Sequence, residues 1–174
     1  MQVLPGLIFI LLFFAGAAFS QTCNTASIPA STPDNQLTDN GNNTVTDNKT
    51  GLMWKKCVEG VTGSTCDSGS AGSFTWQQAL AQPAIVNNAG GFAGYSDWRL
   101  PNIKELTSIV EEQCYDPAIN LNRFPNATSS YVWSGSPHAL DSSYAWYVNF
   151  YHGGSDGGGH RNSSWFVRLV RGGQ

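Results

Sequence analysis

Residues 90–106 read GGFAGYSDWRLPNIKEL and join a glycine-rich turn to a short aromatic run and then to the start of a helix. Pro101 is disfavoured inside a helix, and it pushes Leu100 toward an extended conformation. Asn102 can then cap a helix. Glu105, three residues later, can accept a hydrogen bond from the Asn102 backbone N–H, as in a capping box. The stretch therefore predicts an extended segment followed by a helix that begins immediately after Asn102.

The residues behind this cap have the spacing of an amphipathic helix. Its apolar face consists of Ile103, Leu106, Ile109 and Val110. We expect the helix to continue toward Cys114 and to be docked on a sheet by Trp98 and Leu100. The stretch is thus expected to organise the fold and to carry no chemistry of its own.

Composition and charge restrict the class of protein. The chain has 174 residues, which is enough for one domain of ordinary size. Only 12% of the residues are charged, 12% are aromatic and 19 are glycines, a profile typical of a rigid, loop-rich extracellular domain. The formal net charge of −3 provides no basic field for nucleic acid, so no nucleic-acid partner is expected.

Residues 1–20 read as a secretory signal peptide. Residues 7–14 are continuously apolar, and residues 15–20 are mostly small, as a cleavage site requires. The apolar core is too short to span a membrane comfortably, and no second hydrophobic span follows. We expect a protein that is secreted or displayed at the cell surface, with the periplasm as a third destination, and no membrane span after signal cleavage.

The cysteines predict two disulfides. An exported chain with four cysteines is expected to pair them, and three pairings are open. Cys57 and Cys66 bracket a Gly/Ser/Thr loop and should pair locally, which leaves Cys23 to tie the N-terminal segment to Cys114. No Cys-x-x-Cys occurs, and the three histidines lie far from the cysteines in the sequence, so no zinc site is expected. A reactive thiol is the alternative reading.

Residues 21–38 are rich in Thr, Ser, Pro and Asn and are expected to form an extended N-terminal arm. A cluster of Asp and Asn at 39–43 is a strong turn signal, and strand-like runs follow it at 44–46 and 52–54. Residues 37–56 are therefore predicted to form a hairpin or meander. Calcium is the alternative use of the Asp and Asn oxygens, but the cluster lacks the terminal Glu of a calcium loop.

A second helix is predicted after Thr75. Thr75 and Gln78 have the spacing of another capping box, and Pro83 should kink or end the helix. Beyond residue 130 the chain contains short strand-like runs of aromatic and β-branched residues, at 131–133, 144–151 and 165–170.

Two helices followed by a set of antiparallel strands indicate an α+β fold. We therefore predict a single domain at residues 39–174 that contains two helices, small antiparallel sheets and long loops, stapled by disulfides.

Residues 152–164 contain no apolar side chain that could enter a core, so they are predicted to form an exposed loop. Tyr, Ser, Gly, Asn and Arg are residues that binding loops favour, because they combine contact area with adaptable hydrogen bonding. The candidate ligand-binding residues in and beside this loop are Asn149, Tyr151, His152, Asp156, His160, Arg161 and Asn162. A solvated hairpin loop without a ligand is the alternative.

Catalytic arrangements are weakly supported. The loop contains Ser, His and Asp together, but its many glycines would not hold a catalytic triad rigidly. Glu111 and Glu112 are adjacent, and successive residues of a helix do not face each other. The glycines do not lead into a helix, as a phosphate-binding loop would require. We therefore expect no catalytic residues, no cofactor and no metal site.

Three motifs resemble one known family. They are TGLMW at 50–54, GYSDWRLPN at 94–102 and VRLVRGG at 167–173, and together they look like the Lcl C-terminal domain, named for the terminal domain of a bacterial collagen-like adhesin. The resemblance covers residues 39–173. It implies a C-type-lectin-like fold and extracellular ligand binding; the characterised adhesin recognises sulfated glycosaminoglycans.

A second similarity concerns Arg99, Leu100, Pro101 and Glu105, which resemble a motif of formylglycine-generating enzymes. Those enzymes share the lectin-like fold and depend on a pair of cysteines late in the chain. Here no cysteine follows Cys114, so the resemblance implies the fold without the activity.

Taken together, the sequence predicts an adhesin-like domain at the cell surface that presents its C-terminal loop to an extracellular glycan or protein ligand. The competing class is a structural or assembly module that binds no ligand and forms a homo-oligomer. An enzyme of the formylglycine-generating type that has lost its catalytic cysteines comes third.

The composition of residues 151–164 suggests one further hypothesis. Lectin-like domains serve as scaffolds for diversity-generating retroelements, which mutate adenines in the codons of a target gene. Mutation of an AAC-type Asn codon yields Tyr, His, Gly, Ser, Asp or Arg, and all fourteen residues belong to that set or are Asn. The alternative is a glycine- and serine-rich segment of ordinary origin.

Overall fold

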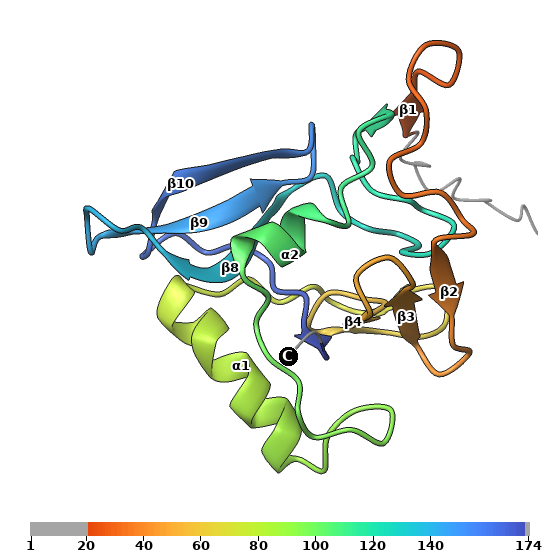
Figure 1. The fold of residues 1–174 in the computed structure, drawn as a ribbon. Helices are drawn as coiled ribbons and strands as arrows, with labels where there is room; N and C mark the ends of the chain where they lie inside the picture. The colour runs from red at the N-terminus through yellow and green to blue at the C-terminus, as the bar shows by residue number, and fades with distance from the viewer. Residues whose placement is uncertain (1–20, 173–174) are drawn as a thin grey trace, which may run out of the picture.

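The computed structural model describes residues 21–172; the predicted signal peptide at 1–20 lies outside the described residues. The described part forms two helices and eleven strands, and the named strands pair antiparallel throughout. Figure 1 shows a three-stranded sheet at one side of the molecule and a four-stranded sheet at the other. The predicted α+β fold with two helices and small antiparallel sheets is confirmed.

The four-stranded sheet has the order β11-β4-β3-β2. Its strands are β2 (Leu37–Asp39), β3 (Thr44–Asp47), β4 (Leu52–Lys55) and β11 (Val170–Arg171). The predicted meander at residues 37–56 is confirmed. Side chains fix its first turn, because Asp39 accepts a hydrogen bond from the Gly41 backbone and pairs with Lys56 at 2.6 Å. Turn chemistry thus accounts for Asp39.

The C-terminal strand is shorter than predicted. In β11, Val170 lies opposite Trp54, so the end of the chain closes onto β4 (Figure 1). Trp165 and Phe166 form only isolated bridges to two different segments. The prediction of one continuous strand at 165–170 is wrong, because its residues are divided among different neighbours.

The three-stranded sheet has the order β10-β9-β8. Its strands are β8 (Tyr131–Pro137), β9 (Tyr144–Asn149) and β10 (Gly154–His160). The prediction of an exposed loop at 152–164 is wrong for its central part, because β10 pairs with β9. A Cβ at Gly159 would lie 2.7 Å from ring atoms of Trp133 and Trp165. The rings of Trp133 and Trp165 therefore pack directly on the backbone of β10 at Gly159. This packing explains why β10 is a strand although it has no apolar side chains.

Helix α1 (Trp76–Asn88) begins at the predicted capping box, with Thr75 and Gln78 bonded to each other's backbone. Pro83 lies inside α1 and does not end it. Proline removes one backbone donor, but the bonds around it carry the helix onward.

Helix α2 (Ile103–Thr107) also begins at its predicted capping box, but it is only five residues long. The prediction of a longer helix ending at Cys114 is wrong. Ile109 and Val110 are buried without being helical, because Val110 bridges to Ile119. Cys114 lies in the short strand β7 (Cys114–Tyr115). Neither described helix is long and apolar enough to cross a membrane.

Two hydrophobic clusters form the core. One includes Leu106 of α2, Trp54 of β4 and Val148 of β9, so it joins the two larger sheets. The other includes Trp76 of α1 together with Trp98 and Trp133. Trp98 and Leu100 lie in the stretch at 90–106, so this stretch contributes buried residues to the core, as predicted.

Both predicted disulfides, Cys23–Cys114 and Cys57–Cys66, are confirmed. The first links β7 to β1 (Thr22–Cys23). The second closes the segment that carries β5 (Val61–Thr62), which pairs with β6 (Ser68–Gly69).

The N-terminal arm is held on the domain by Glu111. The carboxylate of Glu111 accepts hydrogen bonds from the backbone and the hydroxyls of Ser31 and Thr32. Burial alone would raise the pKa of Glu111. The backbone N–H groups of Ser31, Thr32 and Gln113 outweigh that effect and hold this pKa below its usual value. The carboxylate is thus a structural anchor for the arm.

Candidate ligand-binding surface

The seven predicted ligand-binding residues lie on the three-stranded sheet but do not form one site. Asn149, Tyr151 and His152 lie at the turn between β9 and β10. His160, Arg161 and Asn162 lie at the opposite end of β10, and Asp156 lies between the two groups. A strand of this length extends about 20 Å at roughly 3.3 Å per residue, so the two ends cannot hold one small ligand together.

At the turn, the predicted residues mainly bond one another. The side chain of Asn149 accepts a hydrogen bond from the Tyr151 N–H at 2.9 Å, and its amide nitrogen lies 3.0 Å from His152 Nε2. His152 Nδ1 accepts a hydrogen bond from the Gly154 N–H at 3.0 Å. These bonds fix the turn and orient the side chains of Asn149 and His152.

Beside this turn lies a surface that the sequence analysis missed, which we call the aromatic face and define by Tyr131, Tyr147 and Trp165. The ring centroids of Tyr131 and Trp165 are 4.9 Å apart and stacked, and those of Tyr147 and Trp165 are 4.5 Å apart. All three side chains retain exposed surface, and Tyr131 is 39% exposed. Tyr147 and Val148 are successive residues of β9, so their side chains point to different faces of the sheet. Because Val148 was expected in the core, this alternation was the available signal that Tyr147 lies on the other face.

The position of Trp165 depends on a segment far away in the sequence. Phe74 and Trp165 exchange backbone hydrogen bonds at 2.8 and 3.0 Å, and the Trp76 N–H donates to the Arg161 carbonyl at 3.0 Å. Residues 161–165 therefore run beside the entry to α1. This one pairing places Trp165 on the aromatic face and Arg161 next to Trp76.

Asp156 lies opposite Tyr147 in the strand register, beside the aromatic face. One of its carboxylate oxygens accepts a hydrogen bond from the Gly158 N–H, and no described residue forms an ion pair with it. Burial raises the pKa of the Tyr147 hydroxyl, and the negative charge of Asp156 raises it further. An acceptor and three aromatic rings thus lie together on an accessible sheet surface.

At the other end of β10 there is a pocket of about 370 Å³ between the start of α1 and the β8–β9 hairpin. Polar residues dominate its lining, among them Thr75, Ser142, Ser143, His160, Arg161 and Asn162. The Arg161 guanidinium stacks on the Trp76 ring at 4.1 Å, and its Nε donates to the Tyr144 carbonyl at 3.0 Å. The pocket therefore contains an oriented cation.

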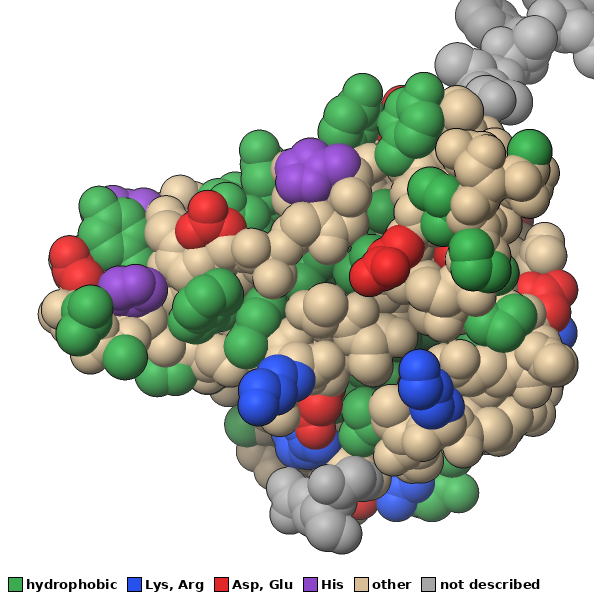
Figure 2. Space-filling model, turned by 45° about the horizontal axis from the view of Figure 1, so that its top comes forward, with side chains coloured by type: hydrophobic (Ala, Val, Ile, Leu, Met, Phe, Trp, Pro, Cys, Tyr) green, Lys and Arg blue, Asp and Glu red, His purple; other side chains and the backbone are tan. Residues whose placement is uncertain are grey.

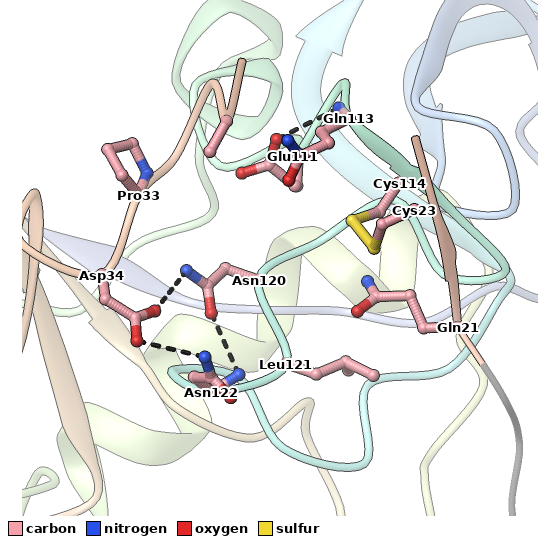
Figure 3. Close-up of a pocket in the computed structure, with 11 residues that line it drawn as sticks. Gln21, Cys23, Pro33, Asp34, Glu111, Gln113, Cys114, Asn120, Leu121 and Asn122 are labelled. Carbon is pink, nitrogen blue, oxygen red and sulfur yellow. Dashed lines mark hydrogen bonds between the residues drawn. A yellow bond between two sulfur atoms is a disulfide. The ribbon is translucent and has the colours of Figure 1, made fainter. Parts of the chain in front are cut away.

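A second pocket, of about 300 Å³, lies between the N-terminal arm and residues 111–122 (Figure 3). Its polar side chains are largely occupied with one another. Asp34 accepts hydrogen bonds from Asn120 at 2.8 Å and from Asn122 at 3.1 Å. Glu111, on its other side, holds the arm. The arrangement indicates a structural seam. Within residues 21–172, no group of three His, Cys, Asp or Glu side chains could hold a metal ion.

Figure 2 shows most of the visible Lys and Arg side chains at the lower end of the molecule, whereas the visible His side chains lie at its left and top. Most basic residues are paired, as in the Arg99–Glu105 and Arg171–Asp97 ion pairs at 2.7 Å. Arg168 is buried, and burial lowers its pKa to about 10 although the charge of Glu59 opposes the shift. The described surface therefore has no extended cluster of free cations.

The structure limits the hypothesis that residues 151–164 are diversified. A Cβ at Gly153 would lie 2.6 Å from Val110, and the Gly153 φ of +81° disfavours other residues. A Cβ at Gly157 would lie 2.9 Å from the His138 ring, and a Cβ at Gly159 would lie 2.7 Å from the rings of Trp133 and Trp165. Free exchange at all fourteen positions is therefore incompatible with this packing.

The chain was compared with known proteins and with models of protein families. No curated protein matches it. The Lcl C-terminal domain model matches residues 43–171, which include both helices and the whole three-stranded sheet. The chain therefore belongs to the Lcl C-terminal domain family.

Proposed function

We propose that this protein is an extracellular, adhesin-like module with a C-type-lectin-like fold that binds a glycan or protein ligand without catalysis. Its binding surface is the aromatic face together with Asn149, His152 and Asp156. Family membership and the two disulfides support an extracellular role, because such bonds persist in oxidising compartments.

The observation that carries the proposal is the aromatic face itself. Single exposed aromatic residues are ordinary, whereas contiguous exposed apolar surface marks interaction sites. Tyr and Trp are enriched in binding surfaces because a rigid ring supplies contact area and its polar atom a hydrogen bond. Asp156 adds a carboxylate oxygen that can accept hydrogen bonds from a ligand. Stacking combined with a nearby acceptor suits a sugar ring or a peptide side chain.

Two observations narrow the proposed activity and the proposed ligand. All four cysteines are in disulfides, so the chain has no free thiol for chemistry of the formylglycine-generating type. The few unpaired cations on the described surface do not suit a long sulfated polymer, so we propose a ligand recognised mainly through stacking and hydrogen bonds.

Binding of the mature protein to glycan and protein arrays tests the proposal. We expect specific hits that Tyr131→Ala weakens at least about tenfold, as for aromatic residues that dominate an interface. Tyr95→Ala is the matched control, because Tyr95 is 37% exposed, close to the 39% of Tyr131, and lies in a different part of the surface. Equal losses in both variants would contradict the assignment of the site. Silence on both arrays, with self-association by light scattering, would favour the assembly module instead.

A further inference from the structure

We propose that the pocket between α1 and the β8–β9 hairpin binds the carboxylate of an acidic saccharide residue, with Arg161 as its main ligand-binding group. The inference rests on the proposed function in that it assumes extracellular ligand binding. It concerns a different part of the surface from the aromatic face, and different residues test it.

The Arg161 guanidinium is oriented by Trp76 and by the Tyr144 carbonyl, not by an ion pair with a described residue. Stacking on Trp76 fixes the plane of the guanidinium, and the bond from Nε to the Tyr144 carbonyl fixes its rotation. No described residue accepts a hydrogen bond from either terminal nitrogen. These nitrogens therefore remain available beside the pocket. A guanidinium edge matches a planar carboxylate with two parallel hydrogen bonds, and little side-chain entropy remains to be lost when it binds.

The carboxylate of Asp141, which lies nearby, does not pair with the terminal nitrogens of Arg161. Asp141 lies in the same hairpin, and its carboxylate accepts a hydrogen bond from the Ser143 N–H at 2.8 Å. Among the described ion pairs, none joins Asp141 to Arg161. The hydrogen bond from Ser143 is the main cause of the lowered pKa of Asp141, and the charge of Arg161 contributes to it. Arg161 nevertheless forms no ion pair with a described residue, whereas Arg99, Arg123 and Arg171 each pair with a carboxylate.

The rest of the lining favours a saccharide over a peptide C-terminus. Ser142, Ser143 and Asn162 offer hydroxyl and amide groups that can both donate to and accept from ligand hydroxyls. A peptide C-terminus would also present an apolar side chain, and the only large apolar side chain in the lining, Trp76, is covered by Arg161. The pocket volume of about 370 Å³ is in the range of small-ligand sites.

Titration of the isotope-labelled mature protein, followed by NMR, tests the inference. We expect galacturonate to shift the Arg161 Nε–H and Trp76 indole signals saturably, and galactose to bind at least about tenfold more weakly, because it lacks the charge-assisted hydrogen bonds. Asn162→Asp adds a negative charge to a described lining that has none and leaves Arg161 itself unchanged. It should weaken galacturonate binding by a similar factor and leave the melting temperature unchanged.

Arg171→Gln is the control for Asn162→Asp, because each substitution lowers the net charge by one. Arg171 also stacks on an aromatic ring, that of Tyr95, but it lies outside the pocket. It should not alter galacturonate binding. Equal binding of galactose and galacturonate, tighter binding of galactose 6-sulfate or of an acetylated tripeptide with a free C-terminus, or no saturable shift at Arg161 would each overturn the inference. Array binding that is weakened by Tyr131→Ala but unchanged by Asn162→Asp would leave the proposed function standing and remove only this site.

Discussion

Gly159 provides the sharpest test of the fold around the candidate surface. The structure places it in β10, with its backbone against two large rings. A Cβ there would lie 2.7 Å from Trp133, 2.7 Å from Trp165 and 2.8 Å from the Ala145 carbonyl oxygen. The Trp133 ring is fully buried and the carbonyl belongs to the paired strand, so neither can move without disturbing the sheet.

Gly159→Ala is therefore an overpacking substitution, which costs about 1–3 kcal/mol in well-packed interiors. Three close contacts place it in the upper part of that range, while the lower entropy of the unfolded chain returns roughly 0.4–1 kcal/mol. We expect a net loss of about 1–2.5 kcal/mol in the free energy of unfolding. For a domain of this size that corresponds to a fall of several degrees in melting temperature.

Gly158→Ala is the matched control, one residue away. A Cβ at Gly158 would contact only the Asp156 carboxylate, at 3.1 Å, and that side chain is exposed and can move. The free energy of unfolding of this control should lie within about 0.5 kcal/mol of the wild-type value, as is usual for surface substitutions. Denaturant unfolding of the two variants gives the comparison. Equal stability of Gly159→Ala and Gly158→Ala would refute the placement of β10 and restore the exposed loop expected from composition.

Two further predictions concern the arm and its anchors. Replacing both Cys23 and Cys114 by Ser should lower the free energy of unfolding by about 2–5 kcal/mol, measured by urea unfolding, because this bridge closes the longer loop, with a sequence separation of 91; an unchanged midpoint would show that the arm does not stabilise the domain. Glu111→Gln should flatten the acid limb of the stability–pH curve. The lowered pKa of Glu111 means that its stabilisation is present above the usual value of 4.5 and is lost as the pH falls through the lowered value. Glu112→Gln, the neighbouring control, should keep the wild-type limb.

The sequence alone determined the features that depend on neighbouring residues. Both helix starts were predictable, because a capping box needs only a side chain and a backbone group three residues apart. The meander at 37–56 followed from turn residues between short apolar runs, and the local Cys57–Cys66 bridge followed from its spacing. The candidate ligand-binding residues were predicted in and beside one exposed loop, whereas the structure distributes them along β10 and at its two ends.

The tertiary structure decided the features that depend on residues far apart in the sequence. A glycine-rich segment has no side-chain pattern of its own, so β10 became a strand only because β9 and the Trp133 and Trp165 rings lie against its backbone. The aromatic face required Phe74 to position Trp165, and the pocket required Trp76 to orient Arg161. Such contacts join residues tens of positions apart. Local propensity does not encode them, because their free energy is gained only when the sheets and α1 come together.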